Sequence, residues 1–354
     1  MFIVLAILAF GIIIAIHEFG HYISAKTLGV KVNEFAIGMG PKLLKKQGKE
    51  TLYTLRALPF GGFCSMEGEH EESEEPDPRS FISQKMWRRI VILASGSVAN
   101  LIAAFIIIII LTAGAVGFYG TSITGLLDGF PNEGPDGLMP GDKIVSINGE
   151  RLYYRDDFRL LMQISKTDHV DIVVNRNNEQ VEIKDLLLER REYTIDGETH
   201  LLYGITFNYI ESNLLETIKF SIYQTYSFVR MIRLSIVMMV SGSASLRDIS
   251  GPVGIVSAMN TIGQEAPTTI AAIGSIIFFT AFIGVNVAIL NLLPIPAMDG
   301  GRILFTLITR VIEKITKKRL DPKYENYINT VAFILLIGLM VLVLYNDVLR
   351  EIRR

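Results

Sequence analysis

Four long uncharged stretches dominate the pattern of hydrophobic and polar residues along the chain. They cover residues 1–16, 98–118, 268–298 and 326–345. Each reaches, or nearly reaches, the roughly 20 apolar residues that a helix needs to cross the hydrocarbon core of a bilayer. The first stretch lacks a basic start and a small-residue cleavage site, so we expect a retained span and not a signal peptide. The pattern predicts a polytopic α-helical membrane protein with about four transmembrane helices.

The third stretch is longer than one helix requires, and it ends in the segment NLLPIPAM. Pro294 and Pro296 must break or unwind a helix there, because proline lacks the backbone donor and clashes with the preceding turn. Non-helical backbone at membrane depth is tolerated where it lines a cavity. We therefore expect a broken helix beside a cavity at this point.

Residues 213–240 are also apolar, but Glu216, Lys219, Arg230 and Arg233 interrupt them, so no uncharged run reaches spanning length. An amphipathic helix lying in the membrane interface fits this pattern better than a span. A span here would invert the topology of everything that follows. The sequence leaves both arrangements open.

Two other regions have the patterns of strands. Residues 30–40 and 49–63 predict a hairpin or small sheet. Residues 120–208 read as a separate polar module with glycine turns, a helix at 156–164 and a hairpin with an asparagine turn at 170–183. The expected organisation is two transmembrane helices with a β loop at 1–118, an inserted α+β module at 119–210, an amphipathic region at 211–265 and the last two transmembrane helices at 266–354.

Composition agrees with a membrane protein and limits the chemistry. Half of the 354 residues are hydrophobic, which is more than an ordinary soluble enzyme carries. A net charge of -2, with no clustered basic groove, does not suggest nucleic acid. Cys64 is the only cysteine, so it can form neither an internal disulfide nor a paired-cysteine metal site. Any metal must use His, Asp or Glu.

The distribution of basic residues predicts the orientation. The loop 25–89 carries eleven Lys or Arg, and the loop 300–323 carries seven more. Both loops should therefore be cytoplasmic, which puts the module at 119–210 outside. The basic tail at 350–354 runs against this orientation.

A metal-binding motif interrupts the first apolar stretch. His17, Glu18 and His21 form the pattern HExxH within IAIHEFGHYI. Positions i and i+4 of a helix share a face, so two imidazoles can bind one zinc ion beside a glutamate. Zinc lowers the pKa of its water to about 7, and a glutamate can accept that proton and pass it to a leaving amine. The motif predicts peptide-bond hydrolysis with Zn²⁺ as the cofactor.

The membrane context decides between this interpretation and a simpler one. On a soluble helix, an HExxH string can be an accidental polar face exposed to water. Here the motif follows sixteen uncharged residues. Ionisable groups within a membrane helix are costly and by default functional. We therefore expect His17 and His21 to bind metal, with Glu18 as the base.

Catalytic zinc takes three protein ligands and leaves one position open, so a third ligand must come from elsewhere. Asp299 is the best candidate, because it is the first charge after the third apolar stretch and follows the proline-containing segment. If the first and third spans run in the same direction, their C-terminal ends place the two histidines and Asp299 on the same side of the membrane. The alternative for Asp299 is a helix N-cap at the interface.

These motifs together closely resemble those of the site-2 proteases, the intramembrane zinc metalloproteases, and especially the bacterial branch that cleaves anti-sigma factors. The resemblance extends over nearly the whole chain, through HEFGH at 17–21, SGSVANLIAAF at 95–105, SGPVGI at 250–255 and NLLPIPAMDGG at 291–301. Ser97 and Met298 depart from the family, which has proline and leucine there. The resemblance implies that His17, His21 and Asp299 are zinc ligands and that Glu18 is the base.

The resemblance also assigns Asn286 and Asn291, in the third span, to holding the unwound substrate. Considered alone, an amide within a span is by default interpreted as forming a hydrogen bond to a neighbouring helix. The closeness of both residues to Asp299 along the chain favours a role at the site.

Two further segments are expected to handle substrate. The family carries a substrate-pairing β element where residues 30–63 predict a hairpin, although a purely structural hairpin is the alternative. An exposed strand edge captures extended peptide through main-chain hydrogen bonds.

The run GLMPGDKIVSINGE at 137–150 strongly resembles a PDZ domain, which binds peptide by strand addition. The module is expected either to bind a peptide or to act as a size gate.

The leading hypothesis is an intramembrane zinc endopeptidase of the bacterial plasma membrane, multi-pass, with its active site toward the cytoplasm. Its expected partners are the lipid bilayer and transmembrane substrates, of the anti-sigma-factor or signal-peptide-remnant kind, already shortened by another protease. A non-proteolytic PDZ-bearing scaffold and a transporter with a zinc site at a broken helix are the alternatives. Glu18 distinguishes the protease from these alternatives, because a structural or transport zinc site needs metal ligands but no catalytic base.

Overall fold

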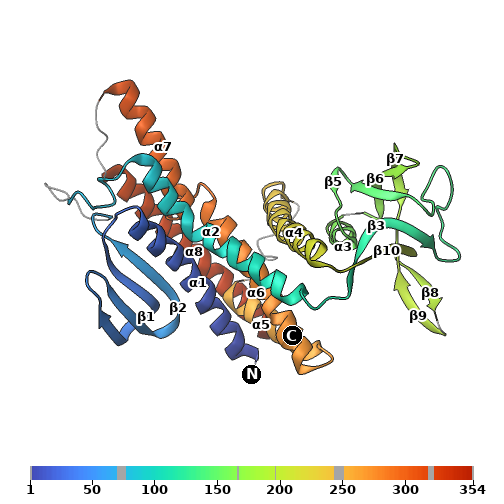
Figure 1. Cartoon of the computed structure of the whole chain (residues 1–354), viewed down its shortest axis with the longest axis horizontal. Coiled ribbons are helices and arrows are strands. Elements are labelled where there is room, and N and C mark those ends of the chain that lie inside the picture. Colours follow the sequence, from blue (N-terminus) through green and yellow to red (C-terminus); the bar gives the residue numbers. More distant parts are fainter. Residues whose placement is uncertain are drawn as a thin grey trace. The chain divides into compact units, whose positions relative to one another are not determined.

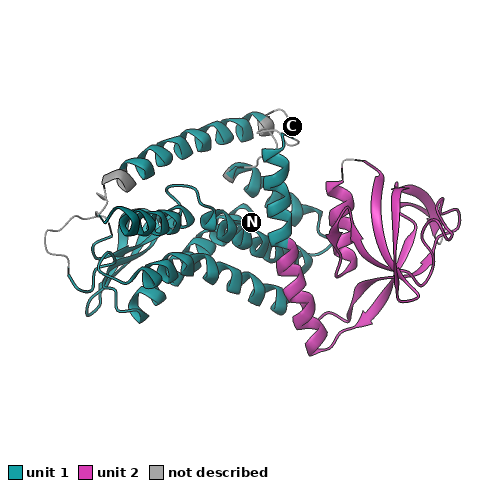
Figure 2. Cartoon of the chain, turned by 90° about the horizontal axis from the view of Figure 1, so that it is seen from above, with its two compact units in different colours: residues 1–111, 228–354 teal, residues 112–227 magenta. Residues whose placement is uncertain are grey.

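Figure 1 shows the computed structural model of the chain, in which residues 2–69, 77–165, 167–195, 197–242, 251–317 and 323–352 are described. The chain forms two compact units (Figure 2). Unit 1 combines Met1–Leu111 with Phe228–Arg354, and unit 2 is Thr112–Ser227. Residues 243–250 of the predicted amphipathic region and 318–322 of the second basic loop lie outside the described residues.

Four helices among the described residues are long and apolar enough to cross a membrane. They are α1 (Phe2–Thr27), α2 (Met86–Thr112), α6 (Thr269–Leu292) and the part Tyr327–Leu349 of α8 (Lys323–Ile352). The prediction of an α-helical protein with about four long apolar helices is therefore confirmed.

The second of these helices begins at residue 86, whereas the uncharged stretch placed its start at 98. The added part consists of residues 90–97, which are uncharged as well, and of a first turn that contains Arg88. Its Nη1 donates to the Leu28 carbonyl at 3.3 Å and to the Gln84 side chain at 3.0 Å. These partners allow a charged residue in the first turn, and the expected start at 98 is too late because it also omits the uncharged residues 90–97.

The helix expected to break does so at the prolines. α6 starts after the cap residue Thr268, whose hydroxyl accepts from the Ala271 N–H at 3.1 Å, and it ends at Leu292. The chain then unwinds before α7 (Asp299–Thr316) begins. Within the unwound segment, Ala297 has a positive φ of 70°, and its N–H donates to Asn329 of α8 at 3.1 Å. The predicted break beside a cavity is confirmed.

The predicted hairpin consists of β1 (Val32–Gln47) and β2 (Leu52–Met66), which pair antiparallel. It lies along α1 (Figure 1). The contact is close, because a Cβ added to Gly11 would lie 2.4 Å from the Pro59 carbonyl oxygen. Further along, the hydroxyls of Tyr22 and Tyr53 are 2.7 Å apart. These contacts bring the last part of β2 beside the HExxH motif.

The core of unit 1 forms where its helices meet. Ala6 and Ile13 of α1 pack with Met259 of α5 (Pro252–Glu265) and with Ile276 and Ile283 of α6. The helix α4 (Leu214–Val240) begins in unit 2 and ends in unit 1. It is not one of the four helices with the length and composition of a span. Its second half packs on α2 and α6 through residues 228 and 232.

Unit 2 is built around an antiparallel sheet with the strand order β10-β3-β4-β6-β7. These strands are β3 (Gly117–Leu126), β4 (Lys143–Ile147), β6 (His169–Arg176), β7 (Glu179–Leu187) and β10 (Ile205–Glu211); β5 (Glu150–Arg151) pairs with β4, and β8 (Arg191–Ile195) pairs with β9 (Glu198–Leu202). The predicted helix is α3 (Arg155–Ile164). The predicted asparagine turn joins β6 to β7, with positive φ at Asn177 and Asn178.

Candidate active site

The residues of the HExxH motif lie on a helix with one buried face. Its buried positions recur every three or four residues, at Ala6, Ala9, Ile13, His17, His21 and Ala25. Each of the two histidines is 7% exposed, and their ring centroids are 4.8 Å apart. The helical period therefore turns both imidazoles toward the interior of unit 1.

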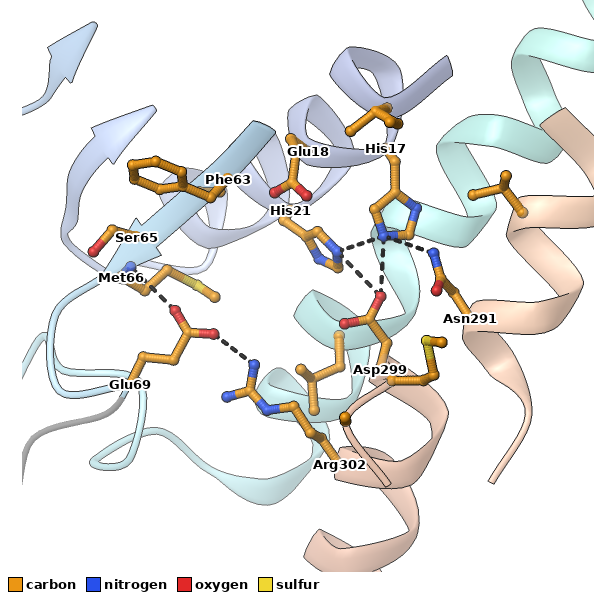
Figure 3. Close-up of a pocket in the computed structure, with 16 residues that line it drawn as sticks. His17, Glu18, His21, Phe63, Ser65, Met66, Glu69, Asn291, Asp299 and Arg302 are labelled. Atoms are coloured by element: carbon orange, nitrogen blue, oxygen red, sulfur yellow. Dashed lines mark hydrogen bonds and ion pairs between the residues drawn. The ribbon is translucent and has the colours of Figure 1, made fainter. Parts of the chain in front are cut away.

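Asp299 meets both histidines, as Figure 3 shows. Its Oδ2 lies 3.1 Å from Nε2 of His17 and 3.2 Å from Nε2 of His21, and the two nitrogens are 3.2 Å apart. Among the described residues, these three form the one group of metal-ligating type whose atoms converge. The N-cap of α7 is Met298, so the alternative of Asp299 as a helix N-cap is wrong.

This donor set fits a zinc ion. Tetrahedral zinc with bonds of about 2.0–2.1 Å separates its ligand atoms by about 3.3 Å, close to the separations found here. Nδ1 of His21 lies 2.8 Å from the Ile92 carbonyl oxygen, and this hydrogen bond orients the ring with Nε2 toward Asp299. Burial would raise the pKa of the Asp299 carboxyl, but hydrogen bonds with His17 and His21 bring it below its usual range. An ionised carboxylate is the form that binds metal.

Two glycines bring α1 and α2 into close contact behind the histidines. A Cβ at Gly20, within the HEFGH segment, would lie 2.4 Å from the Ser95 carbonyl oxygen. A Cβ at Gly96 would lie 2.4 Å from Nε2 of His21 and 2.9 Å from Nε2 of His17. No side chain fits in either place, so the backbone of α2 itself forms the wall of the metal cluster.

Glu18 shares a cavity of about 530 Å³ with the cluster and with residues of β2, α6 and α7. A Cβ on Gly62 of β2 would lie 3.4 Å from the Glu18 Cγ, so the strand passes directly beside this carboxylate. Cys64 also lines the cavity. Burial raises the pKa of its thiol, and Cys64 does not belong to the converging group of His17, His21 and Asp299. The cavity thus brings Glu18, the three converging side chains and the end of β2 to one space.

The two asparagines predicted to hold substrate lie differently. Asn291 lines the cavity, and its Nδ2 is 3.3 Å from Nε2 of His17. Asn286 is half-buried and is not among the residues that line the cavity. Five residues along a helix turn the side chain by about 140°, which explains why both cannot face the same space. Substrate binding by either asparagine stays a prediction.

Sequence reasoning missed Gly96, Glu69 and Arg302. The last two line the cavity and pair across it, with Nη1 of Arg302 2.5 Å from Oε1 of Glu69. No local spacing relates positions 233 residues apart. The available signals were a cation directly after the DGG of the broken helix, and a glycine within the SGSVAN segment of the second span.

The chain was compared with known proteins. A family model described as peptidase family M50 matches residues 5–339. A protein of Clostridium perfringens that is named as a zinc metalloprotease is 37% identical over 351 residues, which cover 99% of each chain. The zinc metalloprotease RasP of Geobacillus kaustophilus is 26% identical, with 97% of this chain and 96% of the relative covered. The regulator of sigma-W protease RasP of Bacillus subtilis is 27% identical, with 97% of each chain covered.

Proposed function

The chain belongs to peptidase family M50, the site-2 proteases, and from this premise we propose how its residues carry out intramembrane proteolysis. It is a zinc metalloprotease. A non-proteolytic scaffold or a transporter is not favoured, because the family match covers nearly the whole chain. The observation that carries the proposal is the convergence of His17, His21 and Asp299 beside Glu18 in one cavity.

In the proposed site, His17, His21 and Asp299 would hold the zinc ion, because their ligand atoms converge. When bound there, zinc would supply Lewis-acid chemistry, which lowers the pKa of a bound water molecule and polarises a carbonyl. Glu18 takes the proton of the attacking water and delivers it to the leaving nitrogen, so the C–N bond breaks to a carboxylic acid and an amine. Asn291, whose amide reaches the cluster, orients the substrate backbone.

The proposed substrate lies as an extended strand along β2, whose residues Phe63 to Met66 line the cavity. An unpaired strand edge binds peptide through main-chain hydrogen bonds, with little demand on sequence. The substrates are transmembrane segments already shortened by another protease, either of the anti-sigma-factor kind or signal-peptide remnants. Support for the first kind is a relative named as a regulator of sigma-W protease.

The proposed location is the bacterial plasma membrane, with the basic loops and the active site toward the cytoplasm. The basic residues of loops 25–89 and 300–323 support this orientation. It leaves residues 119–210 outside as a PDZ domain. Support for that assignment is the antiparallel sheet of unit 2 together with the run GLMPGDKIVSINGE, which includes strand β4.

Separate exchanges of Glu18 and Asp299 test this function in proteoliposomes. Glu18→Gln should keep one zinc per chain and abolish cleavage of a single-span reporter, because glutamine has nearly the same shape but accepts no proton. Asp299→Ala should lose most of its zinc together with cleavage. Glu192→Gln, at an exposed position in unit 2, is the control and should behave as the wild type.

Normal cleavage by Glu18→Gln would exclude the proposed mechanism. Unchanged zinc content in Asp299→Ala would assign the third ligand to another residue. The Glu18→Gln protein also serves as a trap, because the membrane stubs that accumulate with it in cells identify the natural substrates.

A further inference from the structure

The edge of β2 that faces the active-site cavity has a backbone donor occupied by a carboxylate. The N–H of Met66 donates to Oε2 of Glu69 at 3.2 Å. Two residues earlier, Cys64 lines the same cavity as Glu18. Backbone groups at i and i+2 of a strand point to the same side, and the opposite side of this strand pairs with β1. The Met66 N–H therefore lies where an added substrate strand would form its bonds.

Glu69 is held at this edge from the other side of the cavity. Nη1 of Arg302 lies 2.5 Å from Oε1 of Glu69, and the Glu69 side chain is only 8% exposed. The Arg302 guanidinium is itself fixed over the ring of Phe81, 5.5 Å from its centroid, and Phe81 is fully buried. One carboxylate oxygen thus binds the strand edge, and the other binds a guanidinium anchored on α7.

We propose that Glu69 competes with the substrate for the Met66 N–H. Its carboxylate accepts from this N–H in the free enzyme, and a carbonyl of the substrate displaces it when a peptide binds. The inference rests on the proposed function, because it assumes that substrate adds to β2. When a peptide carbonyl takes the Met66 donor, Glu69 keeps its ion pair with Arg302, so no charge is left unpaired. The pair therefore sets the affinity of the last strand-edge position and is a determinant of substrate selection.

Steady-state kinetics on the full-length enzyme test this competition. The enzyme is placed in vesicles of phosphatidylethanolamine and phosphatidylglycerol with a fluorogenic single-span reporter. Glu69→Ala should lower KM about fivefold at unchanged kcat. The Met66 N–H is then free, so a substrate carbonyl can bind it without first displacing a carboxylate. Glu69→Gln should keep most of the wild-type KM, because its amide oxygen still accepts from Met66.

A purely structural ion pair makes the opposite prediction. It would require both Glu69 variants to lose activity alike, because both lose the charge that pairs with Arg302. That result would overturn the inference, as would an unchanged KM in Glu69→Ala. Bound zinc and dependence on Glu18 are measured in every variant. If they are intact while KM does not move, only this inference fails, whereas cleavage that no longer depends on Glu18 contradicts the proposed function itself.

Amide hydrogen exchange at Met66 gives a second test that does not depend on turnover. In the Glu18→Gln background, the Met66 amide should exchange slowly and should exchange faster once Glu69→Ala is added. Saturating reporter should restore slow exchange, because its carbonyl replaces the missing carboxylate. If the reporter leaves exchange at Met66 fast, substrate does not bind this donor and the proposal is wrong.

Discussion

Residues around the metal cluster contribute through their size as well as through their polar atoms. The imidazoles and the Asp299 carboxylate converge because α2 approaches without a side chain at Gly96. The Ile92 carbonyl, one turn earlier on α2, orients His21. A residue that never touches metal can therefore decide whether the ligands meet. This dependence can be tested without changing any ligand.

Gly96→Ala should weaken zinc binding while the four long helices remain folded. The added methyl would lie 2.4 Å from Nε2 of His21 and must displace that ring or α2. Changes that misorient metal ligands typically cost about 10–100-fold in affinity, which competition with a chelator measures. Gly274→Ala in α6 is the matched control, because its Cβ would meet nothing within 4 Å. Equal zinc affinities in the two variants would contradict this account of the α1–α2 contact.

At the scale of elements, the site depends on a broken helix and a hairpin that approach from opposite sides. The α6–α7 break turns Asp299 toward α1, and the N–H of Ala297 in the unwound segment is bound by Asn329 of α8. The hairpin is stabilised by Glu34 of β1, which accepts from Arg56 at 2.8 Å and from Thr54 at 2.7 Å, both on β2. The position of the substrate edge therefore depends on ionic contacts within the hairpin.

Glu34→Gln should loosen the hairpin in a pH-dependent way. Burial would raise the Glu34 pKa, but hydrogen bonds from Arg56, Thr54 and Lys42 hold it below its ordinary value. A lowered folded-state pKa contributes stability above the unfolded-state pKa, and this contribution is lost as pH falls through the folded value. The variant's hairpin should be less stable by about 1 kcal/mol at pH 7, a modest value because Glu34 is only partly buried and solvent screens its ion pairs.

Hydrogen exchange of the hairpin amides, with wild type and variant compared at matched pH, measures this difference. Exchange should be about fivefold faster in Glu34→Gln at pH 7, and the two proteins should converge below the pKa of Glu34. Lys46→Gln, an exposed change on the same strand, should leave exchange unaltered. A difference that persists undiminished in acid would show that the Glu34 charge is not its cause.

At the scale of the whole molecule, unit 2 is an insertion in a chain whose proposed catalytic residues all belong to unit 1. Its first and last strands, β3 and β10, are neighbours in the sheet, with Gly117 opposite Glu211. The chain therefore enters and leaves the sheet at adjacent points. A short connection can replace the sheet without stretching the remaining chain.

Replacing residues 117–211 by a short Gly-Ser linker should preserve zinc binding and Glu18-dependent cleavage of a trimmed reporter. Metal analysis and the cleavage assay check this, and loss of zinc would show that the cluster needs the insertion. The same protein separates the two expectations for the module. A size gate predicts that a reporter with a bulky outer domain is now cleaved as fast as the trimmed one. A peptide-binding domain predicts a higher KM for the trimmed reporter.

The sequence by itself determined the features that are encoded locally. Uncharged runs identified the long apolar helices, the i, i+4 spacing of His17 and His21 identified a metal-binding face, and two prolines marked the break before Asp299. The asparagine turn and the hairpin could likewise be predicted, because strand patterns and turn residues determine structure over only a few neighbouring positions.

Only the tertiary structure decided which distant groups meet. His17 and Asp299 are 282 residues apart, and no periodic pattern along the chain predicts that Nε2 of His17 lies 3.1 Å from Oδ2 of Asp299. The same holds for Glu69 with Arg302, and for the choice of Asn291 over Asn286 as the amide that lines the cavity. Local sequence fixes the conformation and the polarity of each segment. Which faces touch depends on how α1, α2, β2 and the broken helix pack together, because burial and close contact are properties of several segments at once.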